Sequence, residues 1–156
     1  MPYNELFKAS VNKAMALCSR REYCISEVLE KLHSWGTDAD DNARIIELLK
    51  KENFLNEERY ALGFVKDKFN YNKWGKLKIS AHLRAKSIHG DLIKQALDSI
   101  DNETYKQTLV NLLSAHRRSV KAKNQYDLKA KLLRYGLSKG FESNILYDLL
   151  NTFEDQ

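Results

Sequence analysis

The stretch FLNEERYALGFVKDKF, residues 54–69, has the clearest helical pattern of the chain. Its apolar side chains recur at intervals of three and four residues, which is the spacing of one buried face of an α-helix. Asn56 stands at the N-cap of this helix, and Glu57 and Glu58 follow in the first turn, where the helix dipole favours negative charge. Trp74-Gly75 then interrupts the pattern. We therefore expect a capped amphipathic helix whose apolar side chains are core residues: Phe54, Leu55, Tyr60, Phe64, Val65 and Phe69.

Three further helices are expected upstream of this stretch. They cover about 3–18, 22–34 and 39–52, and Trp35-Gly36 ends the second of them. A single proline and six glycines leave few strong breakers in the 156 residues. This composition favours helices over a turn-rich sheet.

The pattern also continues downstream. One helix is expected to carry Ile79 and Leu83, and a shorter one covers about 92–100. A third round begins near Asn102 and ends near Leu150, with a break expected at Gly136.

These rounds match one another at the level of pattern. An offset of 49 places Ile79 on Leu128 and Leu83 on Leu132, and an offset of 54 in the other direction places the same two residues on Ile25 and Leu29. The sequence therefore predicts an all-α fold of three tandem three-helix repeats, similar to helix-turn-helix units, at 1–54, 55–101 and 102–156. Every all-helical chain gives some matches of this kind, so the pattern alone leaves a helical fold without repeats open.

Basic residues gather in two blocks. Nine basic and two acidic side chains lie in residues 59–94, and eight and one lie in residues 117–139, so each block has a net charge of +7, against +5 for the whole chain. The segments before, between and after the blocks are acidic. Such blocks raise the local potential and favour polyanions or acidic protein surfaces as partners.

Long cationic side chains are rarely buried, so these blocks hold the contact candidates. Lys78, His82 and Lys86 are spaced by four residues and form one stripe along a helix. Lys73, Lys76 and Arg84 fall on another side if Lys73 already has helical geometry. The candidates for partner or DNA binding are Lys73, Lys76, Lys78, His82, Arg84, Lys86, Arg117, Arg118, Lys121, Lys123, Lys131 and Arg134. A solvated charged face is the alternative interpretation, and Trp74 either sets a turn or is exposed to a partner.

DNA is one target that such cations fit. Three-helix units resemble helix-turn-helix modules, and Lys and Arg at phosphates would give binding that depends strongly on salt. No cluster of Arg, Asn and Gln opens a candidate recognition helix, so we expect DNA contacts to be independent of sequence.

No catalytic, cofactor or metal site is expected. His33, His82, His89 and His116 lack metal-ligand spacing, and no GxxxxGK phosphate loop occurs. Asp38, Asp40 and Asp41 stand where a helix begins, and we expect them to cap it rather than to bind a metal ion.

The chain is expected to be soluble and cytosolic. Residues 1–9 lack a continuous apolar stretch, and no window approaches the roughly 20 apolar residues of a membrane span. Cys18 and Cys24 do not have a zinc-site spacing, and we expect both thiols to be reduced and buried.

Several segments together resemble the RecX family. The stretch 54–69, WGKLKI at 74–79 and LRAKSI at 83–88 look like the central signature of that family. AMALCSRRE at 14–22 resembles the family's entry into its first repeat. The resemblance is strong over 14–97, whereas 102–150 agrees in helix pattern more than in residues.

The resemblance implies an elongated, curved array of three three-helix modules in the bacterial cytosol. It also implies a regulatory protein that binds RecA and its filament on DNA and dampens strand exchange, ATP hydrolysis and repressor cleavage, which limits recombination and the SOS response. On this hypothesis the chain is a monomer without enzymatic activity, small-molecule substrate or membrane contact. The alternative is a stand-alone DNA-binding protein of helix-turn-helix type that does not select a sequence.

Overall fold

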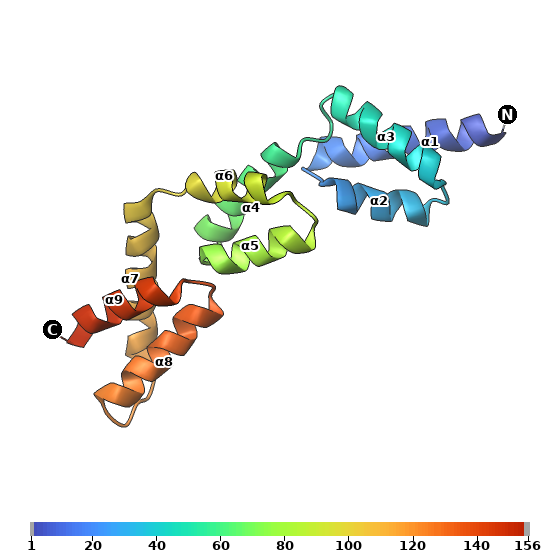
Figure 1. The fold of residues 1–156 in the computed structure, drawn as a ribbon. Helices are drawn as coiled ribbons and strands as arrows, with labels where there is room; N and C mark the ends of the chain where they lie inside the picture. Colours follow the sequence, from blue (N-terminus) through green and yellow to red (C-terminus); the bar gives the residue numbers. More distant parts are fainter. Residues whose placement is uncertain (1, 155–156) are drawn as a thin grey trace. The chain divides into compact units, whose positions relative to one another are not determined.

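The computed structural model describes residues 2–154, with the side chains of 5–152 (Figure 1). Within this range the chain forms nine α-helices and no strand, as the all-α prediction requires. The helices are α1 (Pro2–Arg20), α2 (Ile25–Ser34), α3 (Ala39–Lys51), α4 (Glu57–Asn70), α5 (Lys76–Ala85), α6 (Gly90–Asp98), α7 (Asn102–Ser119), α8 (Gln125–Ser138) and α9 (Ser143–Glu154).

The expected capping residues hold the helix ends. The Asn56 side chain accepts a hydrogen bond of 3.0 Å from the Arg59 backbone N–H at the start of α4. The Asp38 side chain accepts one of 2.8 Å from Asp41 N–H at the start of α3, so the acidic run there caps a helix as predicted. Gly36, with φ of 88°, follows α2 in the left-handed region that favours glycine. The local sequence thus sets these boundaries.

The break expected at Gly136 is wrong. Gly136 lies inside α8 and is buried, and a Cβ built there would stand 2.2 Å from Leu146 Cδ2 of α9. The glycine therefore lets two helices approach closely, rather than ending one of them. The turn comes four residues later at Gly140, whose φ is 94°.

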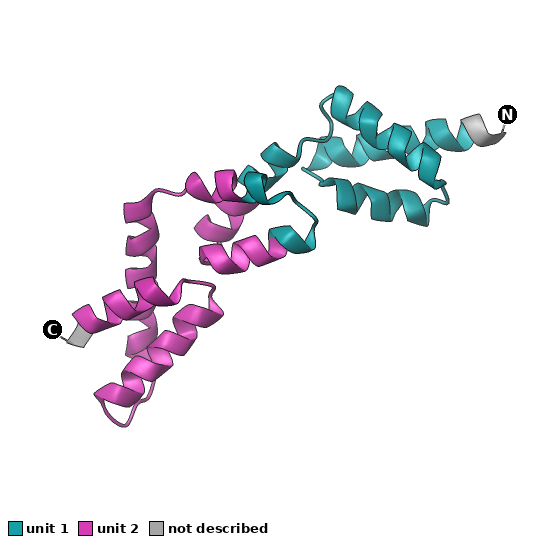
Figure 2. Cartoon of the chain, viewed as in Figure 1, with its two compact units in different colours: residues 1–63, 83–93 teal, residues 64–82, 94–156 magenta. Residues whose placement is uncertain are grey.

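The chain divides into two compact units (Figure 2). One comprises Met1–Gly63 and Leu83–Ile93, and the other comprises Phe64–His82 and Lys94–Gln156. The division passes through α4, α5 and α6, so it does not follow the repeat boundaries expected from the sequence. Those boundaries, at 1–54, 55–101 and 102–156, stay a prediction.

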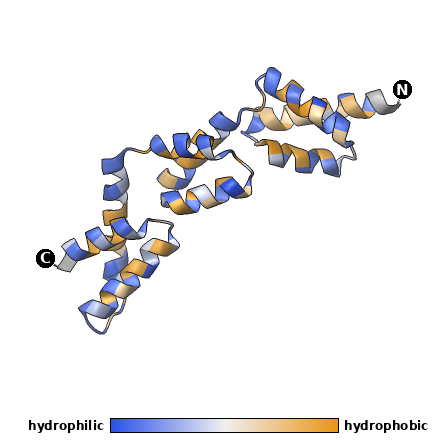
Figure 3. Cartoon of the chain, in the orientation of Figure 1, coloured by the Kyte–Doolittle hydropathy of each residue, from blue (hydrophilic) through white to orange (hydrophobic). Residues whose placement is uncertain are grey.

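In the first unit, α1, α2 and α3 pack against one another. Their apolar faces, orange in Figure 3, bury Val28, Leu32, Ile45 and Leu49 almost completely. Cys24 is also buried and Cys18 is half-buried, and both thiols are free. Burial raises the pKa of both thiols, which keeps them protonated near neutral pH.

In the second unit, α8 packs against α7 and α9. The buried side chains of these helices include Leu109, Leu113, Leu132, Leu146 and Leu150, which supply the apolar burial that stabilises the unit.

Of the core residues predicted around α4, four are buried, namely Leu55, Tyr60, Val65 and Phe69, whereas Phe54 and Phe64 are half-buried.

Candidate functional site

Two lysines and a histidine lie around the half-buried Trp74, which stands between α4 and α5. Lys68 Nζ lies 5.0 Å and Lys78 Nζ 4.7 Å from the centroid of the indole ring. The His82 ring stands 4.5 Å from it, centroid to centroid. The indole quadrupole attracts cations placed over its face, so Trp74 makes a favourable contact with each of the two ammonium groups. We call Lys68, Trp74, Lys78, His82 and Lys139 the Trp74 cluster.

Local backbone structure places these side chains. Trp74 N–H donates to the Lys68 carbonyl at 3.0 Å, which folds the chain back on the end of α4. Lys78 and His82 are four residues apart in α5 and share one face, as the sequence predicted. The turn before α5 includes Lys73 in left-handed geometry with φ of 58°. Lys73 is therefore not helical, and the condition for grouping it with Lys76 and Arg84 is not met.

Lys139 reaches the cluster from the turn after α8. Residues 75–78 meet residues 139–141 here. We call this contact the second joint, because a similar contact earlier in the chain, described below, is the first. Gly75 N–H donates to the Lys139 carbonyl at 2.7 Å, and Leu77 N–H donates to the Gly140 carbonyl at 3.0 Å. Lys139 Nζ donates to the Asn72 carbonyl at 2.9 Å. Burial and the Lys78 ammonium lower the pKa of Lys139, as expected when two cations stand close together.

Tyr105 of α7 contacts the second joint through its hydroxyl group and its ring. Its hydroxyl accepts a hydrogen bond of 2.8 Å from Lys76 N–H and donates to Glu142. Burial and the bond to Glu142 raise the pKa of Tyr105, so the hydroxyl keeps the proton that it donates. The Tyr105 ring also packs at 5.1 Å from Phe141, centroid to centroid.

A first joint forms where residues 24–27 meet Lys86, in the turn after α5. Ser26 Oγ donates to the Lys86 carbonyl at 2.8 Å, and the Ile25 N–H donates to Glu57 at 2.9 Å. Glu27 accepts from Cys24 N–H at 3.1 Å and lies 3.3 Å from Lys86 Nζ. Burial alone would raise the pKa of Glu27, but the Cys24 hydrogen bond and the charges of Arg21 and Lys86 outweigh it, so the pKa falls below its ordinary 4.5.

Glu27→Gln is expected to destabilise the chain by about 1 kcal/mol at pH 7, because the amide keeps the shape and loses the charge. A lowered folded-state pKa gives stability that is present above the ordinary value and is lost as pH falls through the folded value. Thermal unfolding at pH 7 and at pH 3 should therefore show a difference from wild type that shrinks in acid. The control is Glu47→Gln on the 75% exposed Glu47, which should stay within about 0.5 kcal/mol. An equal effect of both substitutions would contradict the account of Glu27.

The structure separates the other candidates of the first basic block. Lys86 lies one residue beyond the end of α5 and pairs with Glu27, so the helical stripe holds only Lys78 and His82. Lys76 Nζ lies 4.8 Å from the centroid of the Tyr105 ring. Lys73 and Arg84 are exposed. Of the predicted residues in this block, Lys78 and His82 are thus the two that meet at Trp74.

The second basic block lies around the end of α7 and the start of α8. Arg117 and Arg118 are exposed in the last turn of α7, and Lys121 and Lys123 are exposed in the loop that follows. Lys131 is half-buried and paired. Its ammonium lies 3.2 Å from the Asp127 carboxylate and donates to the Lys121 carbonyl at 2.6 Å. Arg134 is exposed. The second block therefore presents exposed cations at Arg117, Arg118, Lys121, Lys123 and Arg134, and its Lys131 is paired with Asp127.

The sequence did not point to Lys68 or Lys139 as members of a site. Lys68 belongs to the stretch that was assigned to the core helix, and Lys139 is 61 residues away from Lys78. For Lys139, the internal repeat was the signal that could have shown its place in the site. Lys86 directly follows α5 and Lys139 directly follows α8, and both helices are the middle helix of a three-helix unit. Without the correct helix ends, that correspondence was hidden.

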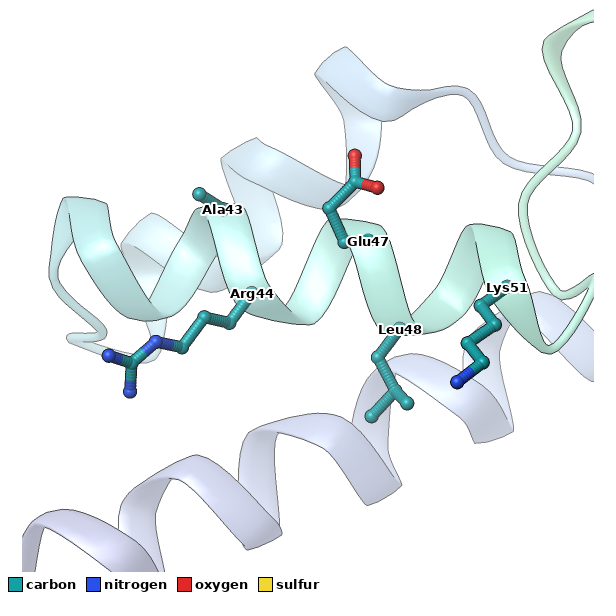
Figure 4. Close-up of a pocket in the computed structure, with 5 residues that line it drawn as sticks. All are labelled: Ala43, Arg44, Glu47, Leu48 and Lys51. Carbon is teal, nitrogen blue, oxygen red and sulfur yellow. The ribbon is translucent and has the colours of Figure 1, made fainter.

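Other surfaces offer less chemistry. A cavity of about 660 Å³ along α3 is lined by Ala43, Arg44, Glu47, Leu48 and Lys51 (Figure 4). It holds one carboxylate and two cations, and Figure 4 shows Leu48 pointing towards a neighbouring helix. Among the residues that the structure describes, no three His, Cys, Asp or Glu side chains are placed to hold a metal ion. Each helix described is too short or too polar to cross a bilayer.

Comparison with known proteins gives consistent matches. A family model described as the second three-helix domain of RecX matches residues 56–97, the segment that carries Lys68, Trp74, Lys78 and His82. The chain is 35% identical over 126 residues to regulatory protein RecX of Clostridium botulinum (strain Eklund 17B / Type B), covering 80% of this chain and 58% of that protein. It is 32% identical over 143 residues to regulatory protein RecX of Clostridium perfringens (strain 13 / Type A), covering 90% and 65%. The chain thus spans 58–65% of the length of these relatives.

Solved structures share the fold. The crystal structure of RecX from Lactobacillus salivarius matches with a TM-score of 0.85 and 24% identity, over 97% of this chain and 98% of that one. A second crystal structure, of a regulatory protein RecX, matches with a TM-score of 0.88 and 20% identity, over 97% of this chain and 74% of the other. At these identities the likeness establishes the three-helix repeat architecture and nothing finer.

Proposed function

The chain belongs to the RecX family of regulatory proteins, and on this premise we propose that it binds RecA and its filament on DNA and inhibits the recombinase, ATPase and coprotease activities of RecA. The observation that carries the proposal is the match over 56–97, because the same segment contains the RecX-like signature. In this function the chain acts in the cytoplasm as a monomer, without a catalytic step, and moderates DNA repair and the SOS response.

The contacts are assigned to the two basic blocks. Lys78 and His82 in α5 stand at the Trp74 cluster, and the exposed cations near the end of α7 offer a second surface. RecA on DNA presents both a protein surface and phosphates, so a strongly positive surface suits this partner. We assign Lys86 a structural role in the first joint, because its ammonium pairs with Glu27. Contacts to DNA are independent of sequence in this proposal.

The experiment is a RecA ATPase assay on single-stranded DNA. Purified chain is expected to slow ATP hydrolysis at or below an equimolar ratio to RecA. Lys78→Glu should raise the concentration that gives half inhibition by roughly fivefold, which corresponds to the loss of about 1 kcal/mol of binding. The matched control is Lys94→Glu, because Lys94 is 80% exposed and lies in α6. Full ATPase activity at a severalfold excess of wild-type chain would contradict the proposal.

A further inference from the structure

The two joints share one construction. In each, the start of a middle helix meets the turn that follows the next middle helix: Ser26 bonds the Lys86 carbonyl, and Gly75 bonds the Lys139 carbonyl. The next residue of each turn is left-handed, Ser87 with φ of 62° and Gly140 with φ of 94°. The positions of one joint can therefore be compared with those of the other, one by one.

Equivalent positions differ in charge. The third residue of α2 is Glu27, which pairs with Lys86 of the first joint. The third residue of α5 is Lys78, and the residue equivalent to Lys86 is Lys139. Where the first joint has a carboxylate facing an ammonium group, the second joint has two ammonium groups. The second joint thus has no carboxylate at the position where the first joint has Glu27, and its Glu142 carboxylate accepts from Tyr105 instead.

Lys68 and His82 join Lys78 at the Trp74 ring. Lys68 and Lys78 both lie over the Trp74 ring, and the His82 ring contacts it. Among the described residues, no carboxylate pairs with Lys68, Lys78 or Lys139, although ion pairs form elsewhere in the chain. Lysines gathered at one ring without a paired carboxylate make the local potential positive, so the cluster favours an anion from outside the chain.

We propose that the Trp74 cluster is a phosphate-binding site. The ammonium groups of Lys68 and Lys78 lie at one ring and Lys139 stands in the adjoining turn, which suits a ligand with more than one negative charge. Lysine binds phosphate as a compact point charge. A protein carboxylate fits less well, since lysine is depleted at protein–protein interfaces whereas nucleic-acid interfaces are strongly positive. Stacking of a base on Trp74 is not part of the proposal, because Lys68, Lys78 and His82 already contact the ring.

The phosphate can come from a nucleic-acid backbone or from a free nucleotide or phosphate ion. The inference deepens the proposed function by giving the chain a phosphate contact of its own, and it rests on that function only for its biological setting. The test contains no RecA. A negative result would therefore leave the inhibition of RecA to be decided by the ATPase assay.

The test follows Trp74 fluorescence in a Trp35→Phe background, where Trp74 is the single indole of the chain. The probes are a 12-nucleotide dT strand, ATP, inorganic phosphate and a hexaglutamate peptide. For a binding phosphate probe, Lys68→Gln with Lys78→Gln should raise Kd roughly tenfold, and for dT the slope of log K against log salt should fall by about 1.4. The control, Lys94→Gln with Lys106→Gln, removes the same charge from exposed sites of α6 and α7 and should change Kd by less than about threefold.

A second variant distinguishes loss of the phosphate site from loss of the folded structure. Lys78→Glu installs at the second joint the residue type that the first joint has, so it should pair with Lys139 and abolish phosphate binding. Its Tm should stay within about 3 °C of wild type, because an ion pair between two half-buried side chains that still reach solvent contributes little stability.

Binding of dT through these lysines would support the site and identify a nucleic-acid backbone as its ligand. Binding of ATP or inorganic phosphate alone would support it with free phosphate as the ligand. Tighter binding of hexaglutamate than of any phosphate probe would overturn the proposal, as would equal losses in the site and control variants or no binding by wild type.

Discussion

Replacing Gly75 with alanine is expected to lower the free energy of unfolding by about 2–4 kcal/mol, because the second joint has no room for a side chain there. A Cβ on Gly75 would stand 2.3 Å from the Gly140 carbonyl oxygen and 2.4 Å from Phe141 N. Both atoms are backbone, so the joint must open and the hydrogen bond from Gly75 to Lys139 is lost. Urea unfolding followed by circular dichroism measures the loss as a lower midpoint.

Gly63→Ala is the matched control for this change. Gly63 lies inside α4, and a Cβ there meets no atom within 4 Å. Because alanine has the higher helix propensity, this variant should gain about 0.5–1 kcal/mol. The two alanine substitutions are thus expected to act in opposite directions. A Gly75→Ala chain as stable as wild type would show that the second joint is not formed as described.

Phe141→Ala is expected to cost about 3–5 kcal/mol, the usual range for deleting a fully buried ring. Phe141 has 0% exposed surface, follows the left-handed Gly140, and packs against the Tyr105 ring. Its removal leaves a cavity next to the hydrogen bonds that Tyr105 makes to Lys76 and Glu142. Equilibrium unfolding in urea should show this loss at an unchanged m-value.

Tyr126→Ala provides the comparison, since it removes an aromatic ring that is 85% exposed at the start of α8. A change of less than about 0.5 kcal/mol is expected there. If Phe141→Ala cost no more than Tyr126→Ala, Phe141 would not be a core residue of the second unit.

The helices and most of the core could be predicted because their signals are local. Apolar spacing located α4, and short polar side chains marked N-caps at Asn56 and Asp38. The helix break predicted at Gly136 was wrong, because a glycine that ends a helix and one that lets a neighbouring helix approach look alike in sequence. Only the position of Leu146, ten residues further along, distinguishes the two.

The register between repeats could not be predicted from apolar spacing alone. Pairing Ile79 and Leu83 with Ile25 and Leu29 includes a leucine that is 37% exposed. Pairing the first residues of α2 and α5 instead places Val28 and Leu32, which are 2% and 0% exposed, on the same two residues. A stripe spaced by three and four residues fits itself again after a shift of three, so the helix starts decide the register.

The Trp74 cluster was visible only in part for a similar reason. The offset of 49 holds at the starts of α5 and α8, but α8 has fourteen residues and α5 has ten, so the turns that follow differ by one helical turn. Lys139 therefore falls out of line with Lys86 in the sequence alignment. Lys78 and His82 were found because both lie on one helix.

Co-sedimentation with RecA filaments assembled on single-stranded DNA tests directly whether the chain is a RecA regulator. A RecA regulator should pellet with the filaments in a saturable way, and less of it should pellet with the same DNA when RecA is absent. A chain that stays in the supernatant with RecA filaments, or that pellets equally with DNA alone, would contradict its assignment as a RecA regulator.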